Sequence, residues 1–250
     1  TPISLWFHHS LQEVFGIERK FTGESAEQIY DQITECLARP EFRPRALFKK
    51  FNIDVLSTTD WAVDNLSYHK AIKKSGWNGR ILPTFRTDSI MNLDHPKWRE
   101  HVNLLGLESG ISVRNFKSFI EAIENRRQYF KKLGATATDY GVTSAYTVEL
   151  GSNEVGAIFD RAMRGVATAD DARRFTGHMI IESARMSRDD GLVMQLHVGA
   201  YRNHNSYIFD KFGPDKGADI PIAGEFTNSL LPLLNKYCND SRLTLILFTL

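Results

Sequence analysis

The stretch Leu192–Asn205 (LVMQLHVGAYRNHN) carries the side chains of this sequence that are best suited to chemistry. An apolar run ends at His197, and Arg202 follows within the next few residues. If the run is a strand, its alternation places Val193, Gln195 and His197 on one face. A neutral imidazole in such a place can bind a divalent metal or move a proton. A core histidine hydrogen-bonded to a backbone carbonyl explains the same residue equally well.

Polar side chains also stand at the ends of three other strand-like runs. They are Asp60 in NIDVLSTTD, Arg86 in RILPTFRTD and Asp139 in GATATDYGVT. The C-terminal ends of parallel strands meet at one edge, which is where α/β enzymes place their chemistry. Each residue also has a structural explanation, Arg86 as a salt-bridge partner and the two aspartates as loop caps or helix N-caps.

Strand-like runs begin near residues 53, 80, 135, 192 and 243, with helical patterns between them. Such alternation gives parallel strands joined by right-handed crossovers. No G-x-G-x-x-G motif follows the first run and no Walker A lysine occurs in the sequence, which argues against a nucleotide-binding sheet. The predicted fold class is therefore α/β, with about five parallel strands forming a portion of a (β/α)8 TIM barrel that carries inserted helical segments.

Two further expectations concern individual strands. Pro83 lies inside the second run and lacks the N–H of a ladder hydrogen bond, so it predicts a distortion there. The last run, LTLILFTL, is almost entirely apolar, which predicts a fully buried strand.

The same patterns predict the domain organisation. Residues 1–52 are expected to form a helical segment, and residues 53–250 a partial barrel with a helical insertion around 97–133. Ser25 and Gln28 have the spacing of a capping box at the start of one helix. A later helix is expected to begin with an N-cap near Asp170.

The bulk composition excludes several classes of protein. The 31 basic and 30 acidic residues leave a net charge of +1, so no nucleic-acid or membrane surface is expected. No apolar run is long enough to span a bilayer. Cys36 and Cys238 lie far apart without metal-type spacing, which predicts reduced thiols and a cytoplasmic protein. The chain begins without a methionine and ends in an apolar run, so we expect it to be the middle of a longer protein.

Several of these motifs, taken together and in order, resemble uronate isomerase (glucuronate isomerase), a family of the amidohydrolase superfamily. The matching stretches are EFRPRALFKKFNIDVLSTTD, RILPTFRTD, FKKLGATATDYG, DGLVMQLHVGAYRNHN and FGPDKGADIP. The resemblance covers nearly the whole chain and implies a (β/α)8 barrel. It also implies the reversible conversion of D-glucuronate to D-fructuronate, and of D-galacturonate to D-tagaturonate, in sugar-acid catabolism.

The resemblance assigns roles to residues of this chain. His197 matches a histidine at the end of the fifth barrel strand, which is a metal ligand or an active-site hydrogen-bonding residue in the superfamily. Arg86 matches an arginine that contacts the substrate, so His197 and Arg86 are the catalytic candidates. Arg202 matches an arginine of the following loop and is a substrate-binding candidate. Asp139, also a substrate-binding candidate, matches an Asp-His-Gly-like stretch in which Tyr140 replaces the histidine.

The resemblance also implies partners beyond these residues. The substrate is a small sugar acid, and a homo-oligomer is compatible with the family. A divalent metal, zinc or manganese, is the cofactor the resemblance allows, with His197 as one ligand. The family's His-x-His and His-Tyr pairs are expected before residue 1, and its aspartate base beyond Leu250.

Moving a sugar carbonyl from C1 to C2 requires a base, an acid and a cation that stabilises the enediol-like intermediate. The planar fork of an arginine can bind the substrate's C6 carboxylate through two hydrogen bonds, and Arg86 and Arg202 suit either arginine task. Two alternatives remain open: a metal-dependent hydrolase of the same superfamily, and a catalytically inert fragment whose first and last strands expose unpaired edges.

Overall fold

The computed structural model describes residues 2–217, 219–237 and 239–249. Its main feature is a five-stranded sheet of order β1-β2-β3-β4-β7, in which the pairs from β2 to β7 are parallel. The strands are β1 (Val55–Trp61), β2 (Arg80–Arg86), β3 (Ala137–Val142), β4 (Val193–Val198) and β7 (Leu245–Phe248). All five strand predictions are therefore confirmed.

One detail of the predicted strands is wrong, and another stays a prediction. β2 includes Pro83, and its register with β3 begins only at Phe85, after the residue that lacks an N–H, so the distortion expected at Pro83 stays a prediction. β7 was expected to be fully buried, but Ile246, Leu247 and Phe248 are each about 40% exposed. Within the described residues β7 ends the sheet order, so only β4 pairs with it.

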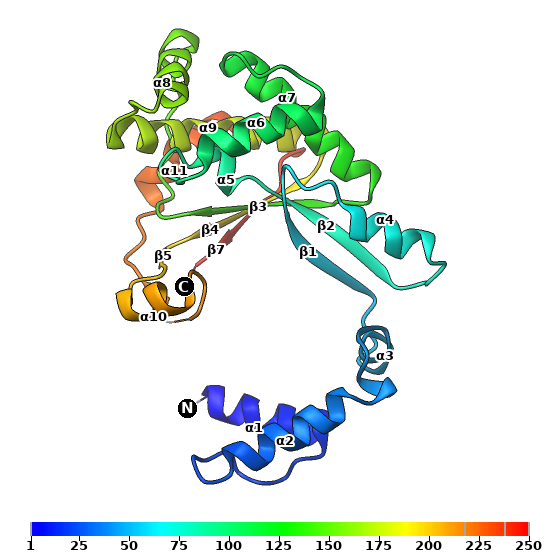
Figure 1. Ribbon diagram of the computed structural model, residues 1–250. Coiled ribbons are helices and arrows are strands. Elements are labelled where there is room, and N and C mark those ends of the chain that lie inside the picture. The colour runs from blue at the N-terminus through cyan, green and yellow to red at the C-terminus, as the bar shows by residue number, and fades with distance from the viewer. Residues whose placement is uncertain (1, 218, 238, 250) are drawn as a thin grey trace. The chain divides into compact units, whose positions relative to one another are not determined.

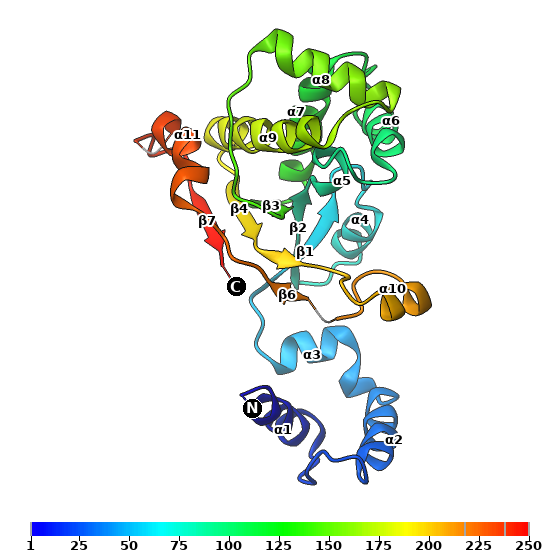
Figure 2. The ribbon, with the colours of Figure 1, turned by 90° about the vertical axis from the view of Figure 1, so that its left-hand side faces the viewer.

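Helices cover one face of this sheet, as Figures 1 and 2 show for α5 to α9 and α11. The helices after β1 are α4 (Ser67–Lys74), α5 (Asp88–Met91), α6 (Trp98–Ser109), α7 (Phe116–Lys132), α8 (Ser152–Arg164), α9 (Ala169–Asp190), α10 (Ser206–Phe212) and α11 (Thr227–Tyr237). The region around 97–133 is two helices, because Gly110 ends α6 in the left-handed conformation at φ 71°. Among the described residues no helix has both the length and the apolar character needed to cross a membrane.

The core lies between the sheet and these helices. Met194, Leu196 and Val198 of β4 are buried, whereas the alternate residues of the strand are only partly buried, as the alternation predicts. Phe85 of β2 packs edge-on against Phe130 of α7, with ring centroids 4.9 Å apart. Such aromatic pairs stabilise a core by about 0.5–1.5 kcal/mol each beyond their area burial.

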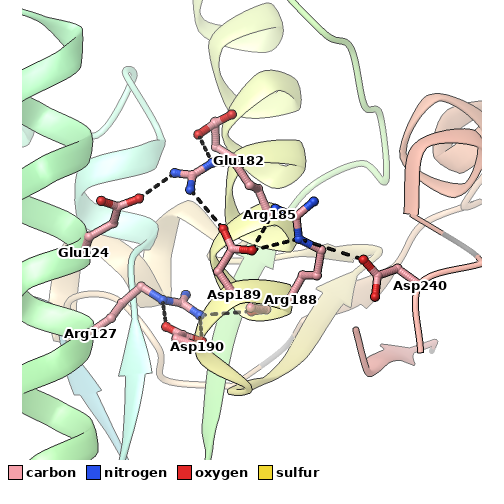
Figure 3. Close-up of polar contacts among 9 residues, drawn as sticks. Glu124, Arg127, Glu182, Arg185, Arg188, Asp189, Asp190 and Asp240 are labelled. Atoms are coloured by element: carbon pink, nitrogen blue, oxygen red, sulfur yellow. Dashed lines mark hydrogen bonds and ion pairs between the residues drawn. The ribbon is translucent and has the colours of Figure 1, made fainter. Parts of the chain in front are cut away.

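A polar network ties α7 to α9 on the helix side of the sheet (Figure 3). The buried Arg127 donates from Nε and Nη2 to the Asp190 carboxylate at 2.6 and 3.0 Å, and from Nη1 to the Tyr140 hydroxyl at 3.0 Å. Nearer the surface, Arg185 donates to Glu124 at 2.7 Å. Because Tyr140 belongs to β3, the Arg127 contacts also fix this strand against the helices.

A small antiparallel sheet, not predicted from the sequence, follows β4. It pairs β5 (Ala200–Tyr201) with β6 (Ile220–Pro221). Gly199, at φ 97°, makes the turn out of β4 that leads into β5, a conformation that favours glycine. This sheet sets the start of the loop that carries Arg202.

The residues up to 56, with 78–80, form a separate compact unit. Its elements are α1 (Pro2–Phe15), α2 (Ala26–Leu37), the 3-10 helix η1 (Pro40–Phe42) and α3 (Pro44–Lys50). Its small core is centred on Leu11, Ile17 and Ile29. The predicted capping box at Ser25 is wrong, since its Oγ donates to the Lys20 carbonyl at 2.6 Å and caps no helix N–H. Cys36 is a free thiol, and Cys238 lies outside the described residues.

Candidate active site

Neighbouring strands place the three strand-end candidates on one face of the sheet. Arg86 on β2 is the register partner of Asp139 on β3. Gly141, two residues further along β3, is the partner of His197 on β4. Because residues i and i+2 of a strand share a face, all four positions lie on the face opposite the buried Leu196.

The side chains of Asp139 and His197 meet on this face. His197 Nδ1 lies 2.5 Å from Asp139 Oδ1; the imidazole is 39% exposed and the carboxylate only 6%. Asp139 Oδ1 accepts no hydrogen bond of regular geometry from any described residue, so we treat the contact as electrostatic. The imidazole also packs on Phe248, with ring centroids 4.2 Å apart. A buried carboxylate beside a partly exposed imidazole can hold that ring in position while it exchanges a proton with a ligand.

Arg86 lies between two carboxylates. Its Nε and Nη2 are 2.8 and 2.7 Å from Asp88 Oδ2, and its Nη1 is 3.4 Å from Asp139 Oδ2. The guanidinium also lies over the Trp61 ring, 5.3 Å from its centroid. The cation is therefore held from several sides and is 24% exposed.

Asp88, which the sequence motifs did not indicate, also belongs to this cluster. It is the first residue of α5, and its Oδ1 accepts the Gly141 N–H at 2.9 Å. Burial raises the pKa of the Asp88 carboxyl, although Arg86 and the Gly141 N–H act in the opposite direction. Its place two residues after a strand-end arginine was the one signal in the sequence that could have identified it.

A cavity of about 1140 Å³ opens on these residues. Arg86, Asp139 and His197 line it together with Arg202. Arg202 does not contact the other three; its side chain is 51% exposed, and Nη1 is 3.7 Å from Asp215 Oδ1. The structure thus gathers three candidates into one cluster and places Arg202 separately on the same cavity.

Asp60 and Tyr140 do not line this cavity. Asp60 accepts the Thr58 hydroxyl at 2.7 Å, and the same hydroxyl lies 2.9 Å from Nε2 of His69 on α4. Tyr140 points into the core, where its hydroxyl accepts from Arg127 at 3.0 Å. Asp60 lies within β1 and bonds a side-chain hydroxyl, so it is not the N-cap of a helix.

Two donors of this cluster suit a metal, the His197 imidazole and the Asp139 carboxylate. A zinc or manganese site needs three or four protein or water ligands. Among the residues that the structure describes, no group of three His, Cys, Asp or Glu side chains could hold a metal ion. Arg86 Nη1, 3.4 Å from Asp139, already supplies positive charge at the carboxylate. These residues alone therefore do not fit a complete metal centre.

Known proteins similar to this chain were found by sequence and by structure. A family model described as glucuronate isomerase matches residues 1–250. A uronate isomerase of Nostoc punctiforme is 48% identical over 248 residues, covering 99% of this chain and 52% of that protein. The crystal structure of glucuronate isomerase from Caulobacter crescentus superposes with a TM-score of 0.94 at 41% identity, covering all of this chain and 52% of that one.

A second solved structure, a uronate isomerase from Thermotoga maritima, has a TM-score of 0.90 at 29% identity and is covered to 55%. The chain therefore spans about half the length of the relatives it matches. These structures confirm the predicted fold class, since the five parallel strands are a portion of a TIM-barrel-like α/β fold.

Proposed function

The chain belongs to the glucuronate isomerase family, and on that premise we propose that it forms about half of an aldose–ketose isomerase. The enzyme interconverts D-glucuronate and D-fructuronate, and D-galacturonate and D-tagaturonate. The observation that carries the proposal is the convergence of Arg86, Asp139 and His197 on one cavity. Membership of the amidohydrolase superfamily, a cytoplasmic location and assembly into a homo-oligomer are parts of the same proposal.

The reaction removes the proton at C2 of the open-chain aldose and returns a proton to C1. Negative charge develops on the oxygens of C1 and C2, so a fixed cation beside them lowers the barrier. Arg86 supplies that cation in the proposal, because its guanidinium is already held by two carboxylates. The Asp139–His197 pair moves the proton between the two sugar oxygens, since its imidazole is open to the cavity.

Arg202 binds the C6 carboxylate in this proposal. Its only charged partner among the described residues, Asp215, is 70% exposed and 3.7 Å away. Such an exposed pair contributes little stability, so a substrate carboxylate can replace it at small cost. Arg86, by contrast, already contacts two carboxylates of the protein, so less of its guanidinium is open to bind the C6 carboxylate.

A divalent metal, zinc or manganese, belongs to the proposal only if residues beyond this cluster complete its ligand set. His197 would hold it together with side chains that the described residues do not supply. A bound metal would stabilise negative charge on the sugar oxygens. The aspartate base is likewise expected from outside residues 1–250, so this segment alone should show little turnover.

The test is a substrate panel on the full-length enzyme that contains this chain. We expect conversion of D-glucuronate and D-galacturonate to their ketoses, and no release of product from amides or esters. Hydrolysis of the amides or esters without aldose–ketose conversion would support the alternative of a metal-dependent hydrolase and contradict the proposal.

A further inference from the structure

We propose that Asp88 is a positioning residue of this site. Its carboxylate holds the Arg86 guanidinium in one orientation, and Gly141, which has no side chain, leaves the space for this pair. The inference rests on the proposed function for its kinetic consequence. Its structural content, the fixed Arg86 side chain, can be tested without any turnover.

The contacts of Asp88 divide its two oxygens between two tasks. Oδ2 lies 2.8 Å from Arg86 Nε and 2.7 Å from Arg86 Nη2. Oδ1 accepts the Gly141 N–H at 2.9 Å. The backbone of β3 thus fixes Oδ1 of Asp88, and Oδ2 holds the Arg86 guanidinium. The Asp88 side chain is only 13% exposed.

The contact with Asp88 determines which nitrogen atoms of Arg86 can still bind a substrate. Nε has a single hydrogen, and Asp88 accepts it. Nη1 has two hydrogens and lies 3.4 Å from Asp139 Oδ2, and Arg86 lines the cavity, so Nη1 is the atom that we assign to the substrate. A long arginine side chain loses rotamer freedom when it is fixed. Because Asp88 fixes Arg86 before the substrate binds, the cation is preorganised, as electrostatic catalysis requires.

Gly141 fits the same explanation. A Cβ at this position would lie 2.6 Å from Asp88 Oδ2 and 3.0 Å from Arg86 Nη2, closer than side chains normally approach. The glycine is not in the left-handed region, so an alanine would suffer from lack of space and not from backbone strain. A side chain at this position would therefore displace the Asp88–Arg86 pair.

The competing explanation is that Asp88 serves only the fold, as the first residue of the short helix α5. A merely structural aspartate would lower stability when replaced, but its effect would not depend on Arg86. The two explanations differ in coupling, which a double-mutant cycle measures.

The direct test uses the full-length enzyme with 15Nε-labelled arginine. The Arg86 Nε–H signal, assigned by its absence in Arg86→Lys, should be protected from exchange in the wild type and lose that protection in Asp88→Asn and Gly141→Ala. The matched control is Asp240→Asn. Asp240 also accepts from Nε and Nη2 of an arginine two residues away, Arg242, but it does not line the cavity. This control should leave the Arg86 signal unchanged, and retained protection in Asp88→Asn would overturn the inference.

The kinetic arm measures kcat/KM for D-glucuronate. Asp88→Asn should lower it between about 10- and 100-fold, as expected when a catalytic group is misplaced. In the Arg86→Lys background the same substitution should change it by less than about threefold, because the group it positions is gone. An equal loss in both backgrounds would overturn the inference. A wild-type enzyme without isomerase activity would contradict the proposed function instead, and the NMR arm would still decide the inference.

Discussion

His197 Nδ1 lies 2.5 Å from Asp139 Oδ1, although the two residues are not register partners. The partner of His197 across the ladder is Gly141, which has no side chain to occupy the space beside the imidazole. The ring therefore reaches diagonally to the carboxylate of Asp139. The same glycine leaves space for the Asp88 carboxylate and the Arg86 guanidinium, which a Cβ at this position would approach to 2.6 and 3.0 Å.

The first prediction concerns this pair. Asp139→Asn in the full-length enzyme should lower kcat for D-glucuronate by roughly 10²-fold, because the neutral amide no longer holds the imidazole in place for proton transfer. The control is Asp60→Asn, an aspartate at the end of β1 that accepts from Thr58 and does not line the cavity. Steady-state kinetics of both variants provide the check. An unchanged kcat in Asp139→Asn would remove the carboxylate from the proposed chemistry.

The second prediction separates the two arginines. Arg86→Met should lower kcat by roughly 10²-fold, because it removes the fixed cation beside the reacting oxygens. Arg202→Met should raise KM by about tenfold, the equivalent of about 1.4 kcal/mol of binding, and leave kcat nearly unchanged. The KM and kcat of each variant with D-glucuronate test this division, and the opposite assignment of the two effects would show that the roles are exchanged.

The strand-end residues could be predicted because strand alternation is local. Arg86, Asp139 and His197 follow from period-two patterns that a parallel sheet brings to one edge. Asp88 was missed because its importance depends on Gly141, which is distant in the sequence. The small sheet that precedes Arg202 was missed because two-residue strands leave no periodic signal.

Helix caps could also not be located from residue spacing alone. Ser25 has capping-box spacing, yet its hydroxyl is taken by Lys20. Asn115 and Thr168 form the capping boxes of α7 and α9, with Ser118 and Asp171 as their partners. The N-cap expected near Asp170 lies at Thr168. The spacing alone does not say which of several nearby backbone groups a hydroxyl will bond.

The third prediction concerns the stability of α7. Asn115→Ala should lower the free energy of unfolding by about 1 kcal/mol, because its side chain accepts the Ser118 N–H at 2.9 Å. Asn115→Asp keeps an acceptor at the N-cap and should be nearly neutral. Denaturant unfolding of the full-length enzyme measures both. Equal losses in the two variants would mean that the cap hydrogen bond does not stabilise the helix.

The fourth prediction concerns pH. Burial lowers the pKa of His178 from its ordinary value of 6.5, and its Nδ1 accepts the Leu150 N–H at 3.2 Å. The unfolded chain therefore takes up a proton at a higher pH than the folded chain does. Stability from this residue is present above pH 6.5 and falls as the pH drops below it, levelling off once the folded imidazole is also protonated.

Unfolding free energies between about pH 7.5 and 5.5 test this prediction. His178→Gln retains a neutral acceptor and should show a shallower fall than the wild type. A slope that is identical in the two proteins would show that His178 is not protonated on unfolding in this range.

The most direct test of the central claim follows D-glucuronate by NMR in D2O with the full-length enzyme and with its Asp139→Asn and Arg86→Met variants. The wild type should form D-fructuronate, with deuterium entering at C1 of the ketose or C2 of the aldose, and both variants should slow this by roughly 10²-fold. A wild type that forms neither ketose nor deuterated aldose, or variants that match its rate, would contradict the proposed function.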